Sequence, residues 1–215
     1  MENNGDNDRL RIEGKAVDGP VSRYLNRRIS RAMTMAILKF NVPITPNTIS
    51  WISFLIAIIA CIFIINKSLI IGGILVQLSS VIDGVDGELA RARGLASRRG
   101  GFLDTMLDRY SDVAIFIGIA MYSIYYSTYN YAVIVVVTAL SGDLLVSYLH
   151  SKGTELVGVH PSLIGPLNSL ASRDVRLFII SLSLIFGVPI IGLILLSFAT
   201  HLYIIIKSYY IYNRL

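Results

Sequence analysis

Charged residues and cysteine are both scarce in this sequence. Charged residues make up 15% of the 215 residues, whereas a typical soluble domain has about 25%. Cys61 is the only cysteine, so disulfide frameworks and cysteine-based metal sites are excluded, and Cys61 is expected to pack as a small apolar residue. Residues 1–20 are polar and mixed in charge, so no cleavable signal peptide is expected. These shortages argue against a soluble or secreted domain.

Apolar residues are abundant and come in long runs. They make up 54% of the chain, and the mean hydropathy is +0.64. Because a helix that crosses a bilayer takes about 20 residues, the sequence predicts an all-α membrane protein with six transmembrane helices in one domain, residues 42–215. The predicted spans are residues 47–65, 69–91, 102–126, 132–152, 175–186 and 189–209.

Two segments precede the first span. Residues 1–19, rich in Asn and Asp, are predicted to be a disordered polar leader. Residues 20–41 place apolar side chains at helical spacing with arginines between them, which predicts an amphipathic helix in the cytoplasmic interface of the membrane. A solvated helix is the alternative. Pro46 suits the first turn of the first span, and Asn47 or Thr48 is expected to cap that helix.

The Lys and Arg residues fall on one side of the predicted spans. Of the nineteen, only Lys67 lies on the other side. Because cytoplasmic loops of membrane proteins are rich in Lys and Arg, we expect an integral cell-membrane protein with both termini in the cytoplasm. Since these cations lie between apolar spans rather than on one soluble surface, nucleic acid is not an expected partner.

Four aspartates lie at the polar ends of the second and third spans. Asp83 and Asp86 are three residues apart, and Asp104 and Asp108 are four apart, so each pair shares one face of its helix. The short connection makes the two helices antiparallel neighbours, which lets the four carboxylates converge. Because clustered carboxylates repel one another and cost about 2.5 kcal/mol or more near the membrane centre, a cation must offset them. Oxygen ligands without His or Cys favour Mg²⁺, Mn²⁺ or Ca²⁺ over zinc.

Glycines and an arginine beside the aspartates indicate phosphate chemistry. Gly87 leaves room for a ligand to approach its helix, and Gly100 comes just before a helix start whose amides can face phosphate. The planar fork of Arg91 matches phosphate oxygens. Together with a metal, these groups indicate phosphoryl transfer.

Two alternatives weaken when the aspartates are taken together. Helix capping, or ion pairs with nearby arginines, would explain a lone aspartate but not two paired sets on adjacent helices. A divalent-cation transporter would need acidic residues spread through the membrane depth, whereas these aspartates gather near one face. The sequence also has no inverted repeats with broken helices.

The spacing of these residues resembles that of a known enzyme family. The pattern is Asp83-x2-Asp86-Gly87-x2-Ala90-Arg91-x8-Gly100-x3-Asp104-x3-Asp108, where x is any residue. This is the motif of the CDP-alcohol phosphotransferases, matched without a departure in type or spacing. The six spans, the amphipathic leading helix and Pro46-Asn47-Thr48 also look like the family.

The resemblance implies a site with two metal ions, Mg²⁺ or Mn²⁺, on the cytoplasmic side of a homodimeric enzyme. The metal ligands would be Asp83, Asp86, Asp104 and Asp108. The residues around the cytidine nucleotide would be Asn47, Thr48, Asp83, Gly87, Ala90, Arg91 and Gly100. Asp108 would be the general base that activates the acceptor hydroxyl, which attacks the phosphorus bearing the donor alcohol and releases CMP.

Three cations lie at the cytoplasmic ends of the fourth and fifth spans, namely Lys152, Arg173 and Arg176. They can bind a phosphate on the acceptor, as basic residues at matching places do in family members that use inositol phosphate. The alternative is ordinary charge on the cytoplasmic side.

Two segments, residues 17–28 and 172–178, look like one branch of the family. That branch joins CDP-inositol to inositol 1-phosphate and gives di-myo-inositol phosphate phosphate. Many of its members carry a preceding cytidylyltransferase domain, which would have to be a separate protein here. The main rival is a phospholipid synthase that uses a CDP-linked lipid with inositol phosphate or glycerol phosphate.

Four further polar residues are not fixed residues of the motif. Asp112 extends the face of Asp108 and is expected in a second metal shell or a hydrogen-bond network. Asp143 is expected to face the bundle interior. Glu88 is expected to point at water, and His150 to border the acceptor pocket or to be incidental.

Overall fold

The helices follow the apolar runs of the sequence closely. The structure is a computed structural model that describes residues 17–126 and 130–215, and it has no β-strand in those ranges. The α-helices are α2 (Arg27–Lys39), α3 (Pro46–Ile65), α4 (Leu69–Ala92), α5 (Arg98–Tyr126), α6 (Ala132–Val157), α7 (Arg173–Ile185) and α8 (Pro189–Tyr212). A π-helical turn at Ser22–Asn26 leads into α2, and a 3-10 turn at Pro161–Leu163 lies between α6 and α7. The predicted all-α class is confirmed.

Helices α3 to α8 coincide with the six predicted spans, within a few residues at each end. Four of them, α3, α4, α6 and α8, are long and apolar enough to cross a membrane. Among the described helices, α5 carries more charge and α7 has only 13 residues, so neither meets the same standard of length and composition.

The start of α3 differs from its prediction. Thr45, not Asn47 or Thr48, is the N-cap: its side chain accepts a hydrogen bond from the Thr48 backbone amide at 3.2 Å. Pro46 occupies the first turn as expected. The cap is displaced because Thr45 has the extended backbone that an N-cap needs, whereas Asn47 and Thr48 are already helical.

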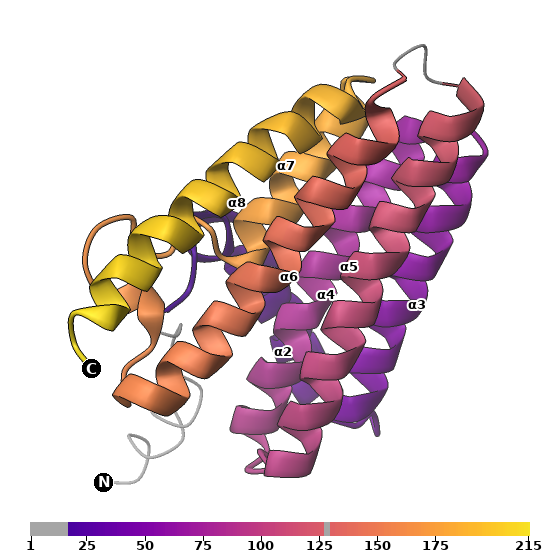
Figure 1. The fold of residues 1–215 in the computed structure, drawn as a ribbon. Helices are drawn as coiled ribbons and strands as arrows, with labels where there is room; N and C mark the ends of the chain where they lie inside the picture. Colours follow the sequence, from indigo (N-terminus) through magenta and orange to yellow (C-terminus); the bar gives the residue numbers. More distant parts are fainter. Residues whose placement is uncertain (1–16, 127–129) are drawn as a thin grey trace, which may run out of the picture.

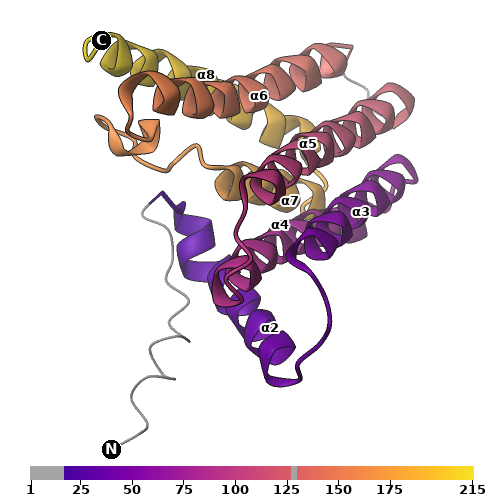
Figure 2. The same cartoon turned by 90° about the horizontal axis from the view of Figure 1, so that it is seen from below.

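The bundle has two groups of helices with α7 between them. Helices α3, α4 and α5 pack together, α6 packs along α8, and α7 contacts both α4 and α8 (Figure 1). Seen from below, α2 lies across the end of the bundle beside α4 (Figure 2). This arrangement brings the end of α4 and the start of α5 to the same place as the start of α7.

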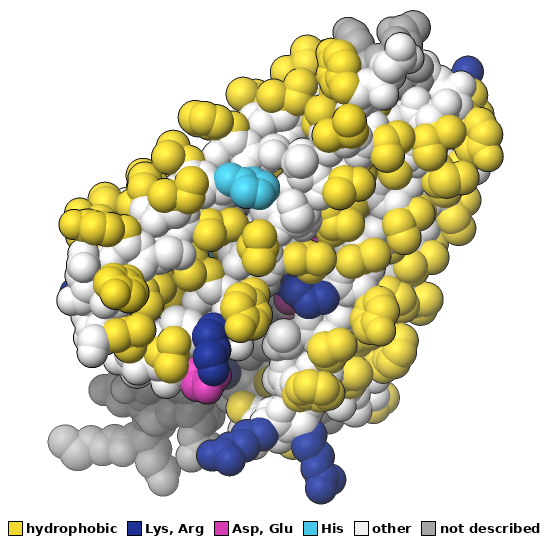
Figure 3. Space-filling view, viewed as in Figure 1, with side chains coloured by type: hydrophobic (Ala, Val, Ile, Leu, Met, Phe, Trp, Pro, Cys, Tyr) yellow, Lys and Arg dark blue, Asp and Glu magenta, His cyan; other side chains and the backbone are white. Residues whose placement is uncertain are grey.

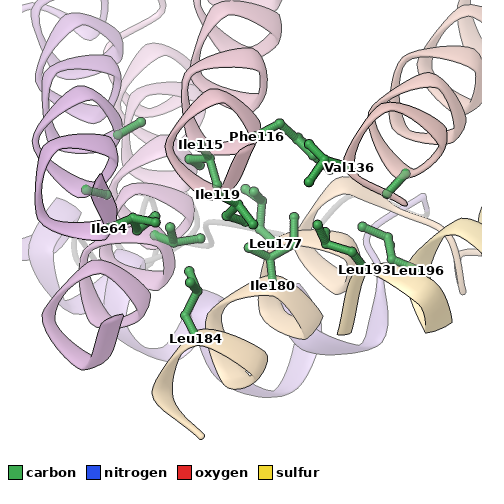
Figure 4. Close-up of a cluster of buried hydrophobic side chains, with 14 residues drawn as sticks. Ile64, Ile115, Phe116, Ile119, Val136, Leu177, Ile180, Leu184, Leu193 and Leu196 are labelled. Carbon is green, nitrogen blue, oxygen red and sulfur yellow. The ribbon is translucent and has the colours of Figure 1, made fainter. Parts of the chain in front are cut away.

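The core lies where the two groups meet α7. Figure 4 shows buried side chains from α3, α5, α6, α7 and α8 in contact there, among them Ile64, Ile119, Leu177 and Leu193. Small residues let helices approach closely, as expected in membrane bundles. A Cβ added at Gly118 of α5 would lie 3.1 Å from the Cα of Cys61 in α3. Cys61 therefore packs as a small side chain, as predicted.

The outer surface of the helices is apolar. Figure 3 shows hydrophobic side chains over most of one face, with Lys and Arg side chains gathered toward one end of the bundle. Large exposed apolar side chains occur on every long helix, for example Leu55, Ile74, Ile134 and Leu195. A soluble monomer rarely exposes apolar patches of this extent, so the surface indicates an integral membrane protein.

Candidate active site

A pocket of about 650 Å³ opens near the end of the bundle where α4 ends and α5 begins. Its walls come from the segment before α2, from α4 and α5, from α6, from the loop after α6, and from the first turn of α7. The volume is in the usual range for a binding site of a small molecule. All four motif aspartates, Asp83, Asp86, Asp104 and Asp108, line it.

Three of the aspartates form a group that fits a metal ion. Asp83, Asp104 and Asp108 can each offer one carboxylate oxygen, and these oxygens lie within 4.8 Å of one another. The carboxyl groups of Asp108 and Asp83 therefore face each other closely. Facing carboxyl groups at this separation need a shared proton or a cation, and oxygen donors alone suit Mg²⁺ or Mn²⁺.

The fourth aspartate, Asp86, is held from two sides. It is buried, and its carboxylate accepts a hydrogen bond from the Ser50 hydroxyl of α3 at 2.5 Å. On its other side its carboxyl group is near that of Asp104. The sequence analysis missed Ser50, because a serine within an apolar run gives no sign of its partner until α3 and α4 are packed.

Arg173 faces the aspartates directly. Its guanidinium lies 2.8 Å from Asp108 and 3.2 Å from Asp83, and its Nε lies 3.0 Å from Asp112. Arg173 was predicted at the acceptor phosphate. In the structure this cation neutralises part of the carboxylate charge and ties the start of α7 to α4 and α5.

The nucleotide-binding candidates divide into two groups. Asp83, Gly87 and Arg91 line the pocket. A Cβ added at Gly87 would lie 3.3 Å from the Arg91 guanidinium, so the absence of a side chain at Gly87 leaves room for Arg91. The others, Asn47, Thr48, Ala90 and Gly100, are not among the pocket-lining residues. Asn47 lies against Gly100, because a Cβ added there would be 3.3 Å from the Asn47 side-chain oxygen.

A second arginine of α4 holds the loop that precedes Asn47. Arg93 donates hydrogen bonds to the backbone carbonyls of Ile44, at 2.5 Å, and Val42, at 2.8 Å. The loop between α2 and α3 is thereby fixed to the end of α4. Sequence reasoning treated Arg93 only as part of the positive charge on one side.

Two of the three predicted acceptor cations line the pocket. Arg173 and Arg176 do so, and Arg176 is only 3% exposed. Within the part of the chain that the structure describes, Arg176 Nε and Ser172 Oγ are buried without a hydrogen-bond partner. Lys152 is not among the lining residues: its ammonium is 2.8 Å from Glu155 on the exposed side of α6.

Two further aspartates belong to a buried ionic network behind the pocket. Asp112 and Asp143 are fully buried, and Arg109 lies between them, 3.0 Å from Asp112 and 3.8 Å from Asp143. Arg176 completes the network at 2.8 Å from Asp143. The predicted interior position of Asp143 and the hydrogen-bond network of Asp112 are confirmed. Each buried carboxylate has a cationic partner, which offsets the cost of removing it from water.

The loop after α6 adds a wall rich in imidazole and hydroxyl groups. His150 of α6 hydrogen-bonds the Tyr203 hydroxyl at 3.0 Å, and the rings of His150 and His160 are 4.6 Å apart. His160 also hydrogen-bonds Ser162 at 2.7 Å. Burial and the nearby Lys207 ammonium lower the pKa of His160, so its ring is neutral near pH 7 and can donate or accept.

Glu88 is not at the surface, contrary to its prediction. It is fully buried and accepts hydrogen bonds from Arg27 at 2.7 Å, Ser30 at 2.8 Å and Thr34 at 2.9 Å. The prediction failed because α2 covers this side of α4. Burial lowers the pKa of Arg27, but hydrogen bonds to Asp18 and Glu88 outweigh that effect and raise it, so Arg27 stays charged.

Comparison with known proteins agrees with the motif. The family model of the CDP-alcohol phosphatidyltransferases matches residues 43–205. A protein of Rubrobacter xylanophilus named bifunctional IPC transferase and DIPP synthase is 41% identical over 172 residues, which cover 80% of this chain and 38% of that relative. The chain thus spans less than half the length of this relative. An archaetidylinositol phosphate synthase of Pyrococcus horikoshii is 33% identical, over 80% of this chain and 86% of its own length.

The fold is also similar to a solved membrane enzyme. The crystal structure of a phosphatidylinositol phosphate synthase of Mycobacterium tuberculosis with CDP-DAG bound gives a TM-score of 0.72 at 22% identity, covering 86% of this chain and 94% of that one. The same synthase in complex with manganese and citrate also gives 0.72, over 85% and 88% of the two chains. At this level of identity the likeness extends to the fold.

Proposed function

The chain belongs to the CDP-alcohol phosphatidyltransferase family, and we propose that it transfers a phospho-alcohol group from a CDP-alcohol to a phosphorylated acceptor alcohol. The observation that carries the proposal is the shared pocket. The motif aspartates line it together with Arg173 and Arg176, so a site for a diphosphate and a site for an acceptor phosphate adjoin.

The reaction uses Asp108 as the base. The acceptor hydroxyl gives its proton to an Asp108 oxygen and attacks the phosphorus that bears the donor alcohol. The bond from that phosphorus to the CMP oxygen breaks, and CMP leaves. Asp83, Asp86, Asp104 and Asp108 hold two ions of Mg²⁺ or Mn²⁺. When bound, these cations offset the negative charge of the diphosphate.

The nucleotide lies on the α4 side of the pocket. Arg91 binds the diphosphate through its planar fork, and Gly87 lets the ligand approach α4. Asn47, Thr48, Ala90 and Gly100 are assigned to the cytidine portion by their places in the family motif, although they lie outside the pocket-lining residues. The position of Asn47 against Gly100 supports this arrangement, because it joins the start of α3 to the start of α5.

The acceptor lies toward α6 and α7. Arg176 and Arg173 bind its phosphate, and the unpartnered Arg176 Nε and Ser172 Oγ support an anion here, since buried polar groups are nearly always bonded. The hydroxyl and imidazole wall of His160 and Ser162 suits a polyol. Lys152 is given no part, because its ammonium pairs with Glu155 on the exposed side of α6.

The preferred substrates are CDP-inositol and inositol 1-phosphate, giving di-myo-inositol phosphate phosphate. Two observations favour this pair. The relative from Rubrobacter xylanophilus carries the DIPP synthase name, and residues 17–28 and 172–178, which resemble that branch, meet at the pocket. A phospholipid synthase with a CDP-linked lipid donor is the second candidate, supported by the match along 86% of the archaetidylinositol phosphate synthase.

The membrane arrangement follows from the helices. All six helices from α3 to α8 span the cell membrane, α2 lies in its cytoplasmic interface, and the pocket and both termini face the cytoplasm. The gathering of Lys and Arg at one end of the bundle supports this orientation. The functional unit is a homodimer.

The test is CMP release by the protein purified in detergent with Mg²⁺. Each donor, CDP-inositol or a CDP-lipid, is supplied with and without inositol 1-phosphate. The control is Asp108→Asn, which keeps the shape of the side chain and removes the base, and its folded state is checked by its thermal midpoint. We expect CMP release that depends on the acceptor, and a fall of about 100-fold or more in kcat for Asp108→Asn.

Each outcome decides between the candidates. Acceptor-dependent release from CDP-inositol supports the preferred pair, and release from the CDP-lipid alone selects the phospholipid synthase. Substantial activity of Asp108→Asn would show that another residue is the general base. No release from either donor, with Mg²⁺ or Mn²⁺, would overturn the proposed function and favour a divalent-cation transporter.

A further inference from the structure

Residues 17–27, here called the N-terminal strap, form part of the pocket although they lie outside the matched residues 43–205. Six of them line it: Val17, Asp18, Gly19, Ser22, Asn26 and Arg27. The sequence analysis assigned the first three of these to the leader. In the structure the strap runs between α4 and the start of α7 (Figure 2).

One end of the strap is fixed to α4. Arg27 donates hydrogen bonds to the buried carboxylate of Glu88 at 2.7 Å and to both oxygens of Asp18 at 3.1 Å. Asn26 donates to the Ser80 hydroxyl at 3.1 Å. Because Glu88 lies between the motif residues of α4, this end moves with the aspartate motif.

The other end is fixed to the first turn of α7. The Ser22 amide donates a hydrogen bond to Asp174 Oδ2 at 2.5 Å. Gly19 packs so closely here that an added Cβ would lie 1.9 Å from Ser172 Oγ and 2.5 Å from an Asp174 oxygen. Contacts below 3 Å would force the strap or α7 to shift.

Asp174 lies in the first turn of α7 and lines the pocket. It directly follows Arg173 and precedes Arg176 by two residues. A contact that holds Asp174 therefore also fixes the positions of the two arginines. The first turn of a helix also favours an acidic side chain. The strap contact therefore joins α4, which carries the motif, to the turn that carries the acceptor cations.

We propose that the strap is a wall of the acceptor subsite and that Asp174 is a positioning residue for the acceptor phosphate. Asp174 acts through Arg173 and Arg176: by accepting the Ser22 amide, it holds the first turn of α7 at the distance from the aspartates that suits a phosphorylated alcohol. This inference rests on the proposed function.

The test compares Asp174→Ala with Asp174→Asn in the full chain, by steady-state CMP release. The alanine removes the acceptor of the Ser22 amide, whereas the asparagine oxygen can still accept it. We expect Asp174→Ala to raise the KM for inositol 1-phosphate about tenfold and to leave the KM for the donor within about twofold. Asp174→Asn should restore most of the loss. Glu155→Ala, which removes an exposed carboxylate of α6, should leave both values unchanged.

A second variant reaches the same contact from the strap. Gly19→Ala changes no residue of α7, but its Cβ forces the strap apart from Ser172 and Asp174. We expect the same selective rise in the acceptor KM. If Asp174→Ala does not fold, Gly19→Ala tests the proposal in its place.

The outcomes separate this inference from the proposed function. If the unmodified protein is active and neither Asp174→Ala nor Gly19→Ala changes the acceptor KM, the inference is overturned and the function stands. Equal rises in both KM values, or an Asp174→Asn variant as impaired as the alanine, would show a general structural role and also overturn it. An unmodified protein that releases no CMP from any donor contradicts the proposed function itself.

Discussion

At the scale of the residue, the site depends on how each aspartate is held. Asp83, Asp104 and Asp108 face one another within 4.8 Å, but Asp86 is buried beneath them and fixed by Ser50. Partners of this kind orient metal ligands and are often worth 10- to 100-fold in metal affinity, as an order of magnitude. Ser50 should therefore matter for metal use although it lies outside the motif.

Removing the Ser50 hydroxyl should weaken the metal site. In Ser50→Ala the buried Asp86 loses a donor and can turn away from the other ligands, so the Mg²⁺ concentration for half-maximal CMP release should rise about tenfold. Ser53→Ala is the matched control: Ser53 is also buried on α3, but its hydroxyl donates to the Ser79 carbonyl. Equal Mg²⁺ dependence in both variants would mean that Ser50 has no role in holding Asp86.

Arg176 and Lys152 should behave differently, although the sequence assigned both to the acceptor phosphate. Arg176→Lys keeps the charge beside Asp143 but loses the planar fork, so the KM for inositol 1-phosphate should rise about tenfold while the donor KM stays the same. Lys152→Ala should change neither value, because Lys152 pairs with Glu155 away from the pocket. A larger effect for Lys152→Ala than for Arg176→Lys would reverse this assignment.

Residue types and spacing predicted the aspartate motif, because helical geometry fixes which residues share a face. The partners of those residues were not predictable. Ser50, Arg93 and Glu88 act across helix contacts, and a serine or glutamate within a helix does not reveal which neighbour it meets. Lys152 was expected at the end of its span, but α6 continues to Val157, and the direction in which Lys152 points around the helix depends on how α6 packs with α8.

At the scale of the element, α2 is attached to α4 by one buried carboxylate and by an apolar cluster. Glu88 accepts from Arg27, Ser30 and Thr34, which lie on the buried face of α2. Apolar residues farther along, such as Ile37, pack against the cluster around Val85. The position of α2, and of the strap before it, thus depends on a polar contact in the middle of the motif helix.

Removing Glu88 should loosen α2 and lower stability. Glu88→Ala leaves the buried Arg27 with Asp18 alone, and loss of one partner of a buried ion pair costs about 3–5 kcal/mol. The thermal midpoint in detergent should fall by several degrees, and protease should cut sooner between α2 and α3. Glu155→Ala, which breaks an exposed ion pair, should leave the midpoint unchanged. An unchanged midpoint for Glu88→Ala would show that the apolar contacts alone hold α2.

At the scale of the whole molecule, the apolar runs of the sequence already located helices α3 to α8. Their order in the bundle was only partly predictable. The short connection from α4 to α5 implied that these helices are direct neighbours, whereas in the structure both pack mainly against α3. Nothing in the sequence showed that α7 lies between α4 and α8. The contact of Gly19 with Ser172 also depends on this arrangement, because it joins segments more than 150 residues apart.

In the proposed reaction of the whole protein, the phosphorus next to the donor alcohol moves to the acceptor. The most direct measurement follows that phosphorus, with a ³²P label placed there in whichever donor supports CMP release, and inositol 1-phosphate as the acceptor. The account predicts that the label appears in a product joined to the acceptor while the released CMP is unlabelled. If the label were recovered only in the hydrolysis product of the donor, or stayed on the nucleotide, the proposed transfer would be contradicted.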